Sequence, residues 1–354
     1  MEKKQYQLLG VMSGTSLDGI DIIEARFHFN SGTSYKILHG TTIPYDEFWK
    51  KKLSSAVNMD EQELQHLNFE YTRYLGNVLK QFIDENGLHG LDAICSHGHT
   101  VKHEPQNKYT LQIGNLKELA KITGQKVVCD FRVQDVQLGG QGAPLVAIGD
   151  KLLFSEYDYC LNLGGFANIS TEEKNRRIAY DICAVNTVLN YYAHKLGLEY
   201  DEGGKIAASG KIIEELYGKL NSMRFYIEKP PKSLGIEWVN REILPLISQY
   251  EENIPDVLHT YIKHIAFQIS EEVENSSEVK VLVTGGGAFN DFLITELGKK
   301  SSAQFVLPSA ELINFKEALI FAFLGALKLR GENNILKSVT GAEKDHSSGV
   351  IFNP

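Results

Sequence analysis

The stretch from Gly10 to Asp21 places small polar side chains between two apolar runs. Its hydroxyl and carboxylate side chains are those of Ser13, Thr15, Ser16, Asp18 and Asp21. Exposed N–H groups in a glycine-rich turn can bind an anion, hydroxyls add neutral donors, and carboxylates can hold a cation between phosphate oxygens. The stretch is typical of a phosphate-binding turn with carboxylates for Mg²⁺. Ordinary hairpin turns use the same residue types, so the stretch alone leaves both interpretations open.

Two more glycine turns follow apolar runs, at Gly164-Gly165 and at Gly285-Gly286-Gly287. Junctions between a strand and a glycine turn are where open α/β folds bind ligands. None of the three turns fits the Gly-x-x-x-x-Gly-Lys-Ser/Thr or the Gly-x-Gly-x-x-Gly pattern. A single turn of this kind is more often structural. Three of them on two similar halves favour a nucleotide in a cleft between the halves.

Three histidines, His97, His99 and His103, lie near the end of an apolar run, with Glu104 beside them. This spacing suits a metal site, because His-x-His on a strand directs two imidazoles to one face. No further ligand is evident nearby. The sequence therefore favours a polar strand end at which histidines donate to a substrate or to the backbone.

Two further positions carry charge after apolar runs. Asp130-Phe131-Arg132 is either a salt-bridged strand end or a group that orients a polar substrate, since arginine binds a carboxylate through two parallel N–H donors. Asp181 ends another run, and we expect a helix to start just after it. It is either the N-cap of that helix or a general base facing the cleft, and the local pattern favours the cap.

The elements that position these residues are read from periodicity. Strands are expected over residues 7–12, 21–29, 35–43, 91–96, 109–113, 126–131, 159–163, 169–171, 177–181 and 280–283. A long helix is expected after Asp60, where Glu63 completes a capping box, and it should end at Asn86-Gly87. Other helices are expected near 116–123, from about Pro144, and over 257–273 and 311–329. Strand, glycine turn, two strands and a helix occur twice, which predicts two similar halves.

Composition narrows the functional class. The 354 residues carry a net charge of −9 and no basic run, which argues against binding of nucleic acid or anionic lipid. The four cysteines are far apart in the sequence, which favours reduced thiols. The N-terminus shows no signal-peptide pattern, and no stretch has the length of a membrane span. We therefore expect a cytoplasmic protein.

The motifs taken together closely resemble the anhydro-N-acetylmuramic acid kinase family. The matching stretches run in order along almost the whole chain: 10–19, 96–100, 103–105, 130–132, 139–145, 162–169, 207–210, 230–233, 285–290, 316–318 and 339–342. The resemblance implies an α/β fold of two ribonuclease-H-like domains, as in actin-like ATPases, around a nucleotide cleft. One domain would comprise residues 1–131 with 332–354, and the other residues 132–331.

The resemblance also implies a reaction. The family converts 1,6-anhydro-N-acetylmuramic acid, ATP and water into N-acetylmuramic acid 6-phosphate and ADP, during peptidoglycan recycling. Asp181 would be the catalytic residue that deprotonates the water. ATP would be bound by Gly14, Thr15, Ser16, Leu17, Asp18, Gly19, Ile20, Asp21, Gly164, Gly165, Gly285, Gly286, Gly287 and Asn290. Asp18 would hold Mg²⁺. The amino-sugar substrate would contact Ser13, His97, His99, Thr100, Asp130, Arg132 and Glu317, with Arg132 as partner of its lactyl carboxylate.

Two stretches depart from the family pattern. The usual Asp-x-Gly-Pro-Gly-Asn is Asp181-Ile182-Cys183-Ala184-Val185-Asn186, and the usual Ser-His-Gly-Gln-Thr has His99 in place of glutamine. These changes leave two alternatives open: a kinase for a related anhydro-sugar, and a catalytically silent nucleotide-binding switch. A homodimer is compatible with the sequence, and no macromolecular partner is otherwise implied.

Overall fold

The computed structural model describes residues 3–14, 16–30, 32–230 and 232–354. The chain forms two compact units: unit 1 contains Met1–Leu153 and Phe315–Pro354, and unit 2 contains Phe154–Asn314. These limits differ from the sequence-based limits of 131 and 332. Residues 132–153 and 315–331 pack with unit 1, where the Nζ atom of Lys316 forms a 2.7 Å ion pair with the carboxylate of Asp150.

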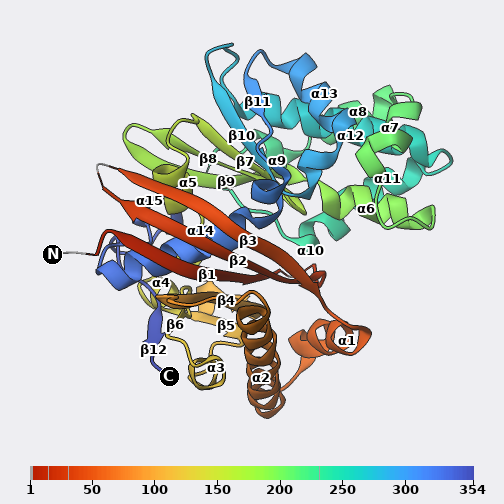
Figure 1. Ribbon diagram of the computed structural model, residues 1–354. Coiled ribbons are helices and arrows are strands. Elements are labelled where there is room, and N and C mark those ends of the chain that lie inside the picture. Colours follow the sequence, from red (N-terminus) through yellow and green to blue (C-terminus); the bar gives the residue numbers. More distant parts are fainter. Residues whose placement is uncertain (1–2, 15, 31, 231) are drawn as a thin grey trace. The chain divides into compact units, whose positions relative to one another are not determined.

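Unit 1 is built on one mixed sheet (Figure 1). Its strands are β1 (Gln5–Ser13), β2 (Gly19–Phe29), β3 (Thr33–Pro44), β4 (Ala93–Glu104), β5 (Tyr109–Ile113), β6 (Val127–Cys129) and β12 (Val350–Phe352). The order is β12-β6-β4-β1-β2-β3, with β5 paired to β4. The first three strands form an antiparallel meander, whereas β4 is parallel to both β1 and β6. The C-terminal strand β12 returns to pair antiparallel with β6.

Helices pack on both faces of this sheet because strand side chains alternate between them. The helices of unit 1 are α1 (Glu47–Ser55), α2 (Glu61–Glu85), α3 (Glu118–Thr123), α4 (Val133–Gln137), α5 (Ala147–Leu153), α15 (Lys337–Thr340) and most of α14 (Ala310–Arg330). Leu9 and Val11 of β1 share a buried core with the apolar face of α2. Gly10, between them, faces α14: a β-carbon there would lie 2.0 Å from the carbonyl oxygen of Ala318.

Unit 2 repeats the arrangement. Its strands are β7 (Tyr159–Leu163), β8 (Phe166–Glu173), β9 (Arg176–Ala184), β10 (Lys280–Thr284) and β11 (Gln304–Val306). Their order is β11-β10-β7-β8-β9, again an antiparallel meander followed by two parallel strands. Its helices are α6 (Asn186–Lys195), α7 (Lys205–Ser209), α8 (Glu214–Asn221), α9 (Arg224–Ile227), α10 (Ile236–Trp238), α11 (Leu244–Ile247), α12 (Ile254–Glu272) and α13 (Asp291–Lys300).

The two sheets therefore share one strand order, which is that of ribonuclease-H-like domains. This confirms the predicted fold class and the predicted repeat. The predicted capping box of α2 is also present, with Asp60 accepting from the N–H of Glu63 and Glu63 accepting from that of Asp60. Two local expectations are wrong. Helix α5 begins at Ala147, not near Pro144, and Asp181 lies inside β9, not before a helix.

Candidate functional site

In each unit the predicted binding residues lie near the carboxyl ends of parallel strands. Ser13 ends β1 and Gly14 follows it, Asp130 follows β6, Gly164 follows β7, and Gly285 follows β10. This edge is where ligands bind in open α/β sheets, because several strand-to-loop junctions meet there. The side chains and glycines at these junctions can be described unit by unit.

The turn between β1 and β2 spans Gly14 to Asp18, of which Thr15 lies outside the described residues. Leu17 has a left-handed backbone (φ 62°), and its N–H donates to the carbonyl of Gly14 over 3.4 Å. The side chains of Ser16 and Asp18 are exposed at the tip. The turn thus presents polar groups to solvent, as a phosphate-binding turn requires.

The end of the turn is fixed by the neighbouring strand. A β-carbon at Gly19 would lie 2.4 Å from the carbonyl oxygen of Ile43, so only glycine fits, and Ile20 beside it is fully buried. The hydroxyl of Thr42 donates to Oδ1 of Asp21 over 2.6 Å. Burial raises the pKa of Asp21, the Thr42 hydrogen bond opposes this, and the negative charge of Asp18 adds to it. The negative charge of Asp18 thus acts on Asp21, and a cation near both would offset it.

Ser13 and His99 are brought together by the parallel pairing of β1 with β4. The Ser13 hydroxyl is bonded to Nδ1 of His99 over 2.9 Å and to the hydroxyl of Tyr45 over 2.7 Å. Burial lowers the pKa of His99 to about 4, so the imidazole is neutral near pH 7. Neighbouring Thr100 accepts a 3.3 Å hydrogen bond from the amide of Gln112.

His97 and Arg132 form the second pair in unit 1. Nε of Arg132 donates to Nε2 of His97 over 2.8 Å, and Nδ1 of His97 donates to the carbonyl of Gly98 over 2.9 Å. Nη1 of Arg132 donates to the carbonyl of Gly142 over 2.5 Å. Burial lowers the pKa of Arg132 to about 10, and the negative charges of Glu317 and Asp135 oppose that shift. The guanidinium is thus held on two sides, and no bond to Nη2 is found among the described residues.

His103 does not join a metal site. Its Nδ1 lies 3.0 Å from the hydroxyl of Thr110, and the described residues contain no group of three or more metal-binding side chains. Asp130 follows β6 with a left-handed backbone (φ 60°), a conformation that L-residues other than glycine seldom adopt. Burial raises the pKa of Asp130. Strained carboxylates of this kind are frequent at ligand sites.

Asp181 in unit 2 is not a helix cap. It pairs with Asn168 across β8 and β9, and α6 begins five residues later with Val185 as its N-cap residue. Oδ2 of Asp181 accepts hydrogen bonds from the Ser233 hydroxyl (3.0 Å) and from the N–H of Leu234 (2.8 Å). Burial raises the pKa of Asp181, and these two hydrogen bonds oppose the shift. Within the described residues Oδ1 has no partner, so it remains available as a proton acceptor.

The glycine turns of unit 2 lie against each other. A β-carbon at Gly285 (φ 82°) would lie 2.8 Å from the backbone of Leu163, and one at Gly287 would lie 3.0 Å from its carbonyl oxygen. The carbonyls of Gly164 and Gly165 accept from the first N–H groups of α6, which caps that helix. Gly286 lies beside them, and Asn290 is the N-cap of α13 through a 3.0 Å bond from the N–H of Leu293.

Several residues without a role in the sequence-based assignment contact the predicted ones, and three of them illustrate how far the sequence could have indicated such contacts. Ser233 holds Asp181, Tyr45 holds Ser13, and Gly142 holds Arg132. Ser233 and Gly142 belong to quoted family motifs, 230–233 and 139–145, so the motifs could have pointed to them. Nothing in the local pattern around Tyr45 indicates its contact, which depends on the fold.

Comparison with known proteins identifies relatives over the whole chain. A sequence model of the anhydro-N-acetylmuramic acid kinase family matches residues 6–354. The anhydro-N-acetylmuramic acid kinase of Mannheimia succiniciproducens is 34% identical over 99% of both chains. The enzyme of the same name from Aliivibrio fischeri is 34% identical, with 97% of this chain and 98% of the relative aligned. The one from Nitrosomonas europaea is 30% identical, with 97% of this chain and 99% of the relative aligned.

The similar proteins of known structure share less sequence identity with this chain. An activator of 2-hydroxyisocaproyl-CoA dehydratase from Clostridium difficile, solved with bound ADPNP, is 14% identical with a TM-score of 0.43. The alignment covers 92% of this chain and 97% of that one. The fold assignment therefore depends on the strand order of the two sheets. The full-length family match and the relatives at 30% identity or more establish that this chain belongs to the anhydro-N-acetylmuramic acid kinase family.

Proposed function

We propose that this protein is an ATP-dependent kinase that opens the 1,6-anhydro ring of 1,6-anhydro-N-acetylmuramic acid and phosphorylates O6. The observation that carries the proposal is the family match from residue 6 to residue 354, with relatives of the same name aligned over nearly their whole length. The products are N-acetylmuramic acid 6-phosphate and ADP. The reaction would recycle cell-wall sugar in the cytoplasm. As a separate finding, in the described residues none of the helices has the length and apolar character needed to cross a bilayer.

Asp181 is the proposed general base. Its free Oδ1 accepts a proton from water while the water oxygen forms a bond to the anomeric carbon and the bond from that carbon to O6 breaks. O6 then bonds to the γ-phosphorus as the bond to the β-phosphate oxygen breaks, and ADP leaves. The two hydrogen bonds on Oδ2 support this role, because they fix the carboxylate without occupying the reacting oxygen.

The glycine turns are the proposed binding groups for ATP. Gly14 to Asp21 would hold phosphates through backbone N–H groups, Gly164 and Gly165 would form a second phosphate turn, and Gly285 to Gly287 would contact the adenosine. Support comes from the close packing at Gly285 and Gly287, where no side chain fits. Asn290 caps α13 through Oδ1 and would contribute by positioning this turn.

Mg²⁺ fits the pair of carboxylates in unit 1. The ion prefers oxygen ligands and in kinases is commonly held by one or two carboxylates together with substrate phosphates. Asp18 is exposed on the turn, and after burial its charge adds to the raised pKa of Asp21. We propose Asp18 as the direct ligand. When bound, the ion would neutralise charge on the transferred phosphoryl group.

Arg132 is the proposed partner of the lactyl carboxylate. Nη2 of Arg132 has no partner among the described residues, and burial lowers the pKa of His97, so the imidazole on Nε is neutral. Nη2 could therefore donate to an anionic group, although the carboxylates of Glu317 and Asp135 already offset part of the guanidinium charge. Ser13, His99, Thr100, Asp130 and Glu317 would complete the sugar site. The neutral state of His99 matters here, because a neutral imidazole can accept a hydrogen bond that the cation cannot.

The test is ADP release with 1,6-anhydro-N-acetylmuramic acid, compared with the non-anhydro sugar and with an anhydro-sugar that lacks the lactyl group. Turnover only with the lactyl-bearing anhydro-sugar supports the proposal. Turnover with the other anhydro-sugar at equal efficiency indicates a kinase for a related substrate. Binding of ATP without turnover of any of the three indicates a silent nucleotide-binding protein, and gel filtration of the same sample decides between monomer and homodimer.

A further inference from the structure

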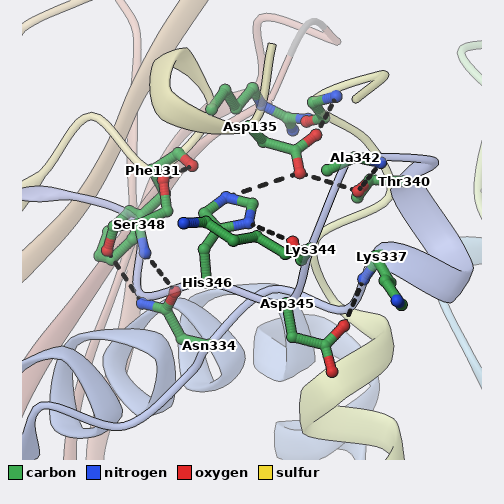
Figure 2. Close-up of polar contacts among 12 residues, drawn as sticks. Phe131, Asp135, Asn334, Lys337, Thr340, Ala342, Lys344, Asp345, His346 and Ser348 are labelled. Atoms are coloured by element: carbon green, nitrogen blue, oxygen red, sulfur yellow. Dashed lines mark hydrogen bonds and ion pairs between the residues drawn. The ribbon is translucent and has the colours of Figure 1, made fainter. Parts of the chain in front are cut away.

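A buried carboxylate in unit 1, that of Asp135 on α4, joins two motifs that the proposed reaction leaves without a role. Its side chain is fully buried. Oδ2 accepts from the N–H of Gly142 over 2.7 Å, and Oδ1 accepts from the hydroxyl of Thr340 over 2.8 Å. Figure 2 shows Asp135 between Thr340 and His346, whose Nε2 lies 3.6 Å from Oδ1. The carboxylate thus links the glycine-rich loop 139–145 to the C-terminal segment 339–342.

Gly142 connects this carboxylate to Arg132. While its N–H is bonded to Asp135, its carbonyl accepts from Nη1 of Arg132 over 2.5 Å. The loop comes so close to α4 that side chains are excluded at Gly140 and Gly142. A β-carbon at Gly140 would lie 2.2 Å from Oδ2 of Asp135, and one at Gly142 (φ 66°) would lie 2.8 Å from the side chain of Val136.

The C-terminal segment holds the other side of Arg132 as well. The Ser348 hydroxyl donates to the carbonyl of Phe131 over 2.6 Å, and the backbone of Ser348 is itself bonded to the side chain of Asn334 (Figure 2). Residues 131 and 135, on either side of Arg132 in the chain, are therefore both anchored to the segment 334–348. The backbone on both sides of Arg132 is therefore held in place. This reduces the conformational entropy that the guanidinium side chain loses when it binds an anion.

We infer that Asp135 is a positioning residue for Arg132: by holding Gly142 and Thr340, it fixes the guanidinium in the orientation that binds the substrate's carboxylate. The inference rests on the proposed role of Arg132. A carboxylate suits this position because donors reach both of its oxygens, whereas the amide of asparagine offers only one acceptor oxygen. The two family motifs at 139–145 and 339–342 then have the same role: both position the guanidinium of Arg132.

The test compares two substrates: 1,6-anhydro-N-acetylmuramic acid and the same sugar with its lactyl carboxylate converted to the primary amide. The ratio of their kcat/KM values measures recognition of the carboxylate. Arg132→Met sets the reference for loss of that recognition. We expect Asp135→Asn to lower the ratio roughly tenfold, the size of a charged hydrogen bond lost or misplaced, mainly through KM for the acid, with KM for ATP unchanged.

Threonine variants keep the test decisive if Asp135→Asn fails to fold. Thr340→Val removes the hydroxyl that bonds Oδ1 at nearly the same volume, and Thr340→Ser retains it. Thr123→Val is the matched control, because that buried hydroxyl in the same unit bonds, among the residues that the structure describes, only the helix carbonyls of Leu119 and Ala120. Thr340→Val should lower the ratio in the same direction as Asp135→Asn, whereas Thr340→Ser and Thr123→Val should leave it unchanged.

The outcomes separate this inference from the proposed function. If Arg132→Met removes the preference for the acid but folded Thr340→Val and Asp135→Asn keep it, the positioning role is refuted and the role of Arg132 stands. If Arg132→Met itself keeps the preference for the acid, the proposed role of Arg132 and the positioning role of Asp135 are both refuted. The proposed kinase reaction is not affected by that outcome. A lower ratio in Asp135→Asn that disappears in the Arg132→Met background would establish that Asp135 acts through Arg132.

Discussion

At the scale of single residues, Asp181 offers one carboxylate oxygen to the reaction and keeps the other bonded to Ser233 and Leu234. Asp181→Asn preserves the shape and can still accept from both donors, but it cannot take a proton. Loss of a general base typically lowers the rate by about 10²–10⁴-fold. We therefore expect turnover to collapse by that factor while the affinity for ATP, measured by calorimetry, is unchanged.

Stability separates catalysis from a structural role in the same variant. Burial raises the pKa of Asp181, so the folded state disfavours its charged form, and above that raised pKa the charge reduces the stability of the fold. Removing the charge should leave the melting temperature at neutral pH the same or higher. An Asn variant that melts early, with turnover per folded molecule preserved, would end the catalytic assignment.

Ser233 contributes to lowering the pH at which Asp181 is ionised. Its hydrogen bond lowers the pKa of Asp181 against the larger effect of burial, so removing the bond should raise that pKa further. The acid limb of kcat/KM, where activity falls as the pH falls through the pKa of the base, should move to higher pH in Ser233→Ala. Ser233→Thr keeps the hydroxyl and is the control. A lower rate with an unmoved acid limb would mean that Ser233 does not act on the base.

Asp18 is expected to govern the dependence on the metal. Asp18→Asn keeps the size of this exposed side chain but removes the charge that would bind Mg²⁺. The Mg²⁺ concentration at half-maximal turnover should rise at least about tenfold, since each lost charged contact is worth about 1.5–3 kcal/mol. Glu104→Gln, an acidic residue on the same sheet in unit 1, is the control. An unchanged Mg²⁺ titration for Asp18→Asn would remove the metal assignment.

The candidate site was predicted from the sequence as residue types, and only partly as contacts. The glycine turns and the polar strand end at His97 and His99 follow apolar runs that are visible in the sequence. The bond between Arg132 and His97 joins residues 35 apart, and it exists because β4 and β6 pair in parallel. Pairing between strands distant in the chain leaves no local pattern, so such partners emerge only from the fold.

At the scale of elements, the packing of α14 against the sheet of unit 1 requires small residues. A β-carbon at Gly325 would lie 2.1 Å from Sγ of Cys95 on β4. Gly298 in α13 is also inside a helix but has no atom within 4 Å of its added β-carbon. We expect Gly325→Ala to lower the free energy of unfolding by about 1–3 kcal/mol, and Gly298→Ala to raise it by about 0.4–1 kcal/mol.

Urea denaturation measures the free energy of unfolding of both variants. A second variant, at Cys95, tests whether the sulfur atom is what the new methyl group meets. The double variant Cys95→Ala with Gly325→Ala should recover part of the loss, because the new methyl group occupies the space of the missing sulfur. If Gly325→Ala proves as stable as the parent protein, the close approach of α14 to β4 would be contradicted.

Helix and strand positions were predictable where local signals are strong. The capping box at Asp60 and the asparagine-glycine end at Asn86-Gly87 both act within one turn, and they place α2 correctly. The end of β9 has no such signal. Cys183 and Ala184 after Asp181 are small and apolar and suit a helix or a strand, but both are fully buried, and Ala184 pairs with Phe166 of β8. Tertiary pairing extends the strand past the point that the sequence predicts.

At the scale of the whole molecule, each unit has its own buried core, and we expect a hinge motion between two such units when substrates bind. The reaction needs water at the anomeric carbon yet must prevent direct hydrolysis of ATP, and closure over both substrates would achieve this. We expect the radius of gyration from small-angle scattering to decrease when a nonhydrolysable ATP analogue and the sugar are both present. The analogue alone is the control, and an equal radius in all samples would contradict closure.

The division between the units falls inside α14, between Asn314 and Phe315, and the other connection follows directly after α5 at Leu153. A continuous helix resists bending because each turn is braced by backbone hydrogen bonds. We expect the helical propensity of the few residues around position 314 to govern how stiff this connection is. Asn314→Gly should make this connection more flexible, and position 314 lies outside the residues proposed to bind ATP or sugar. Substitutions within one turn of helix would then change the rate of closure without changing which substrates are bound.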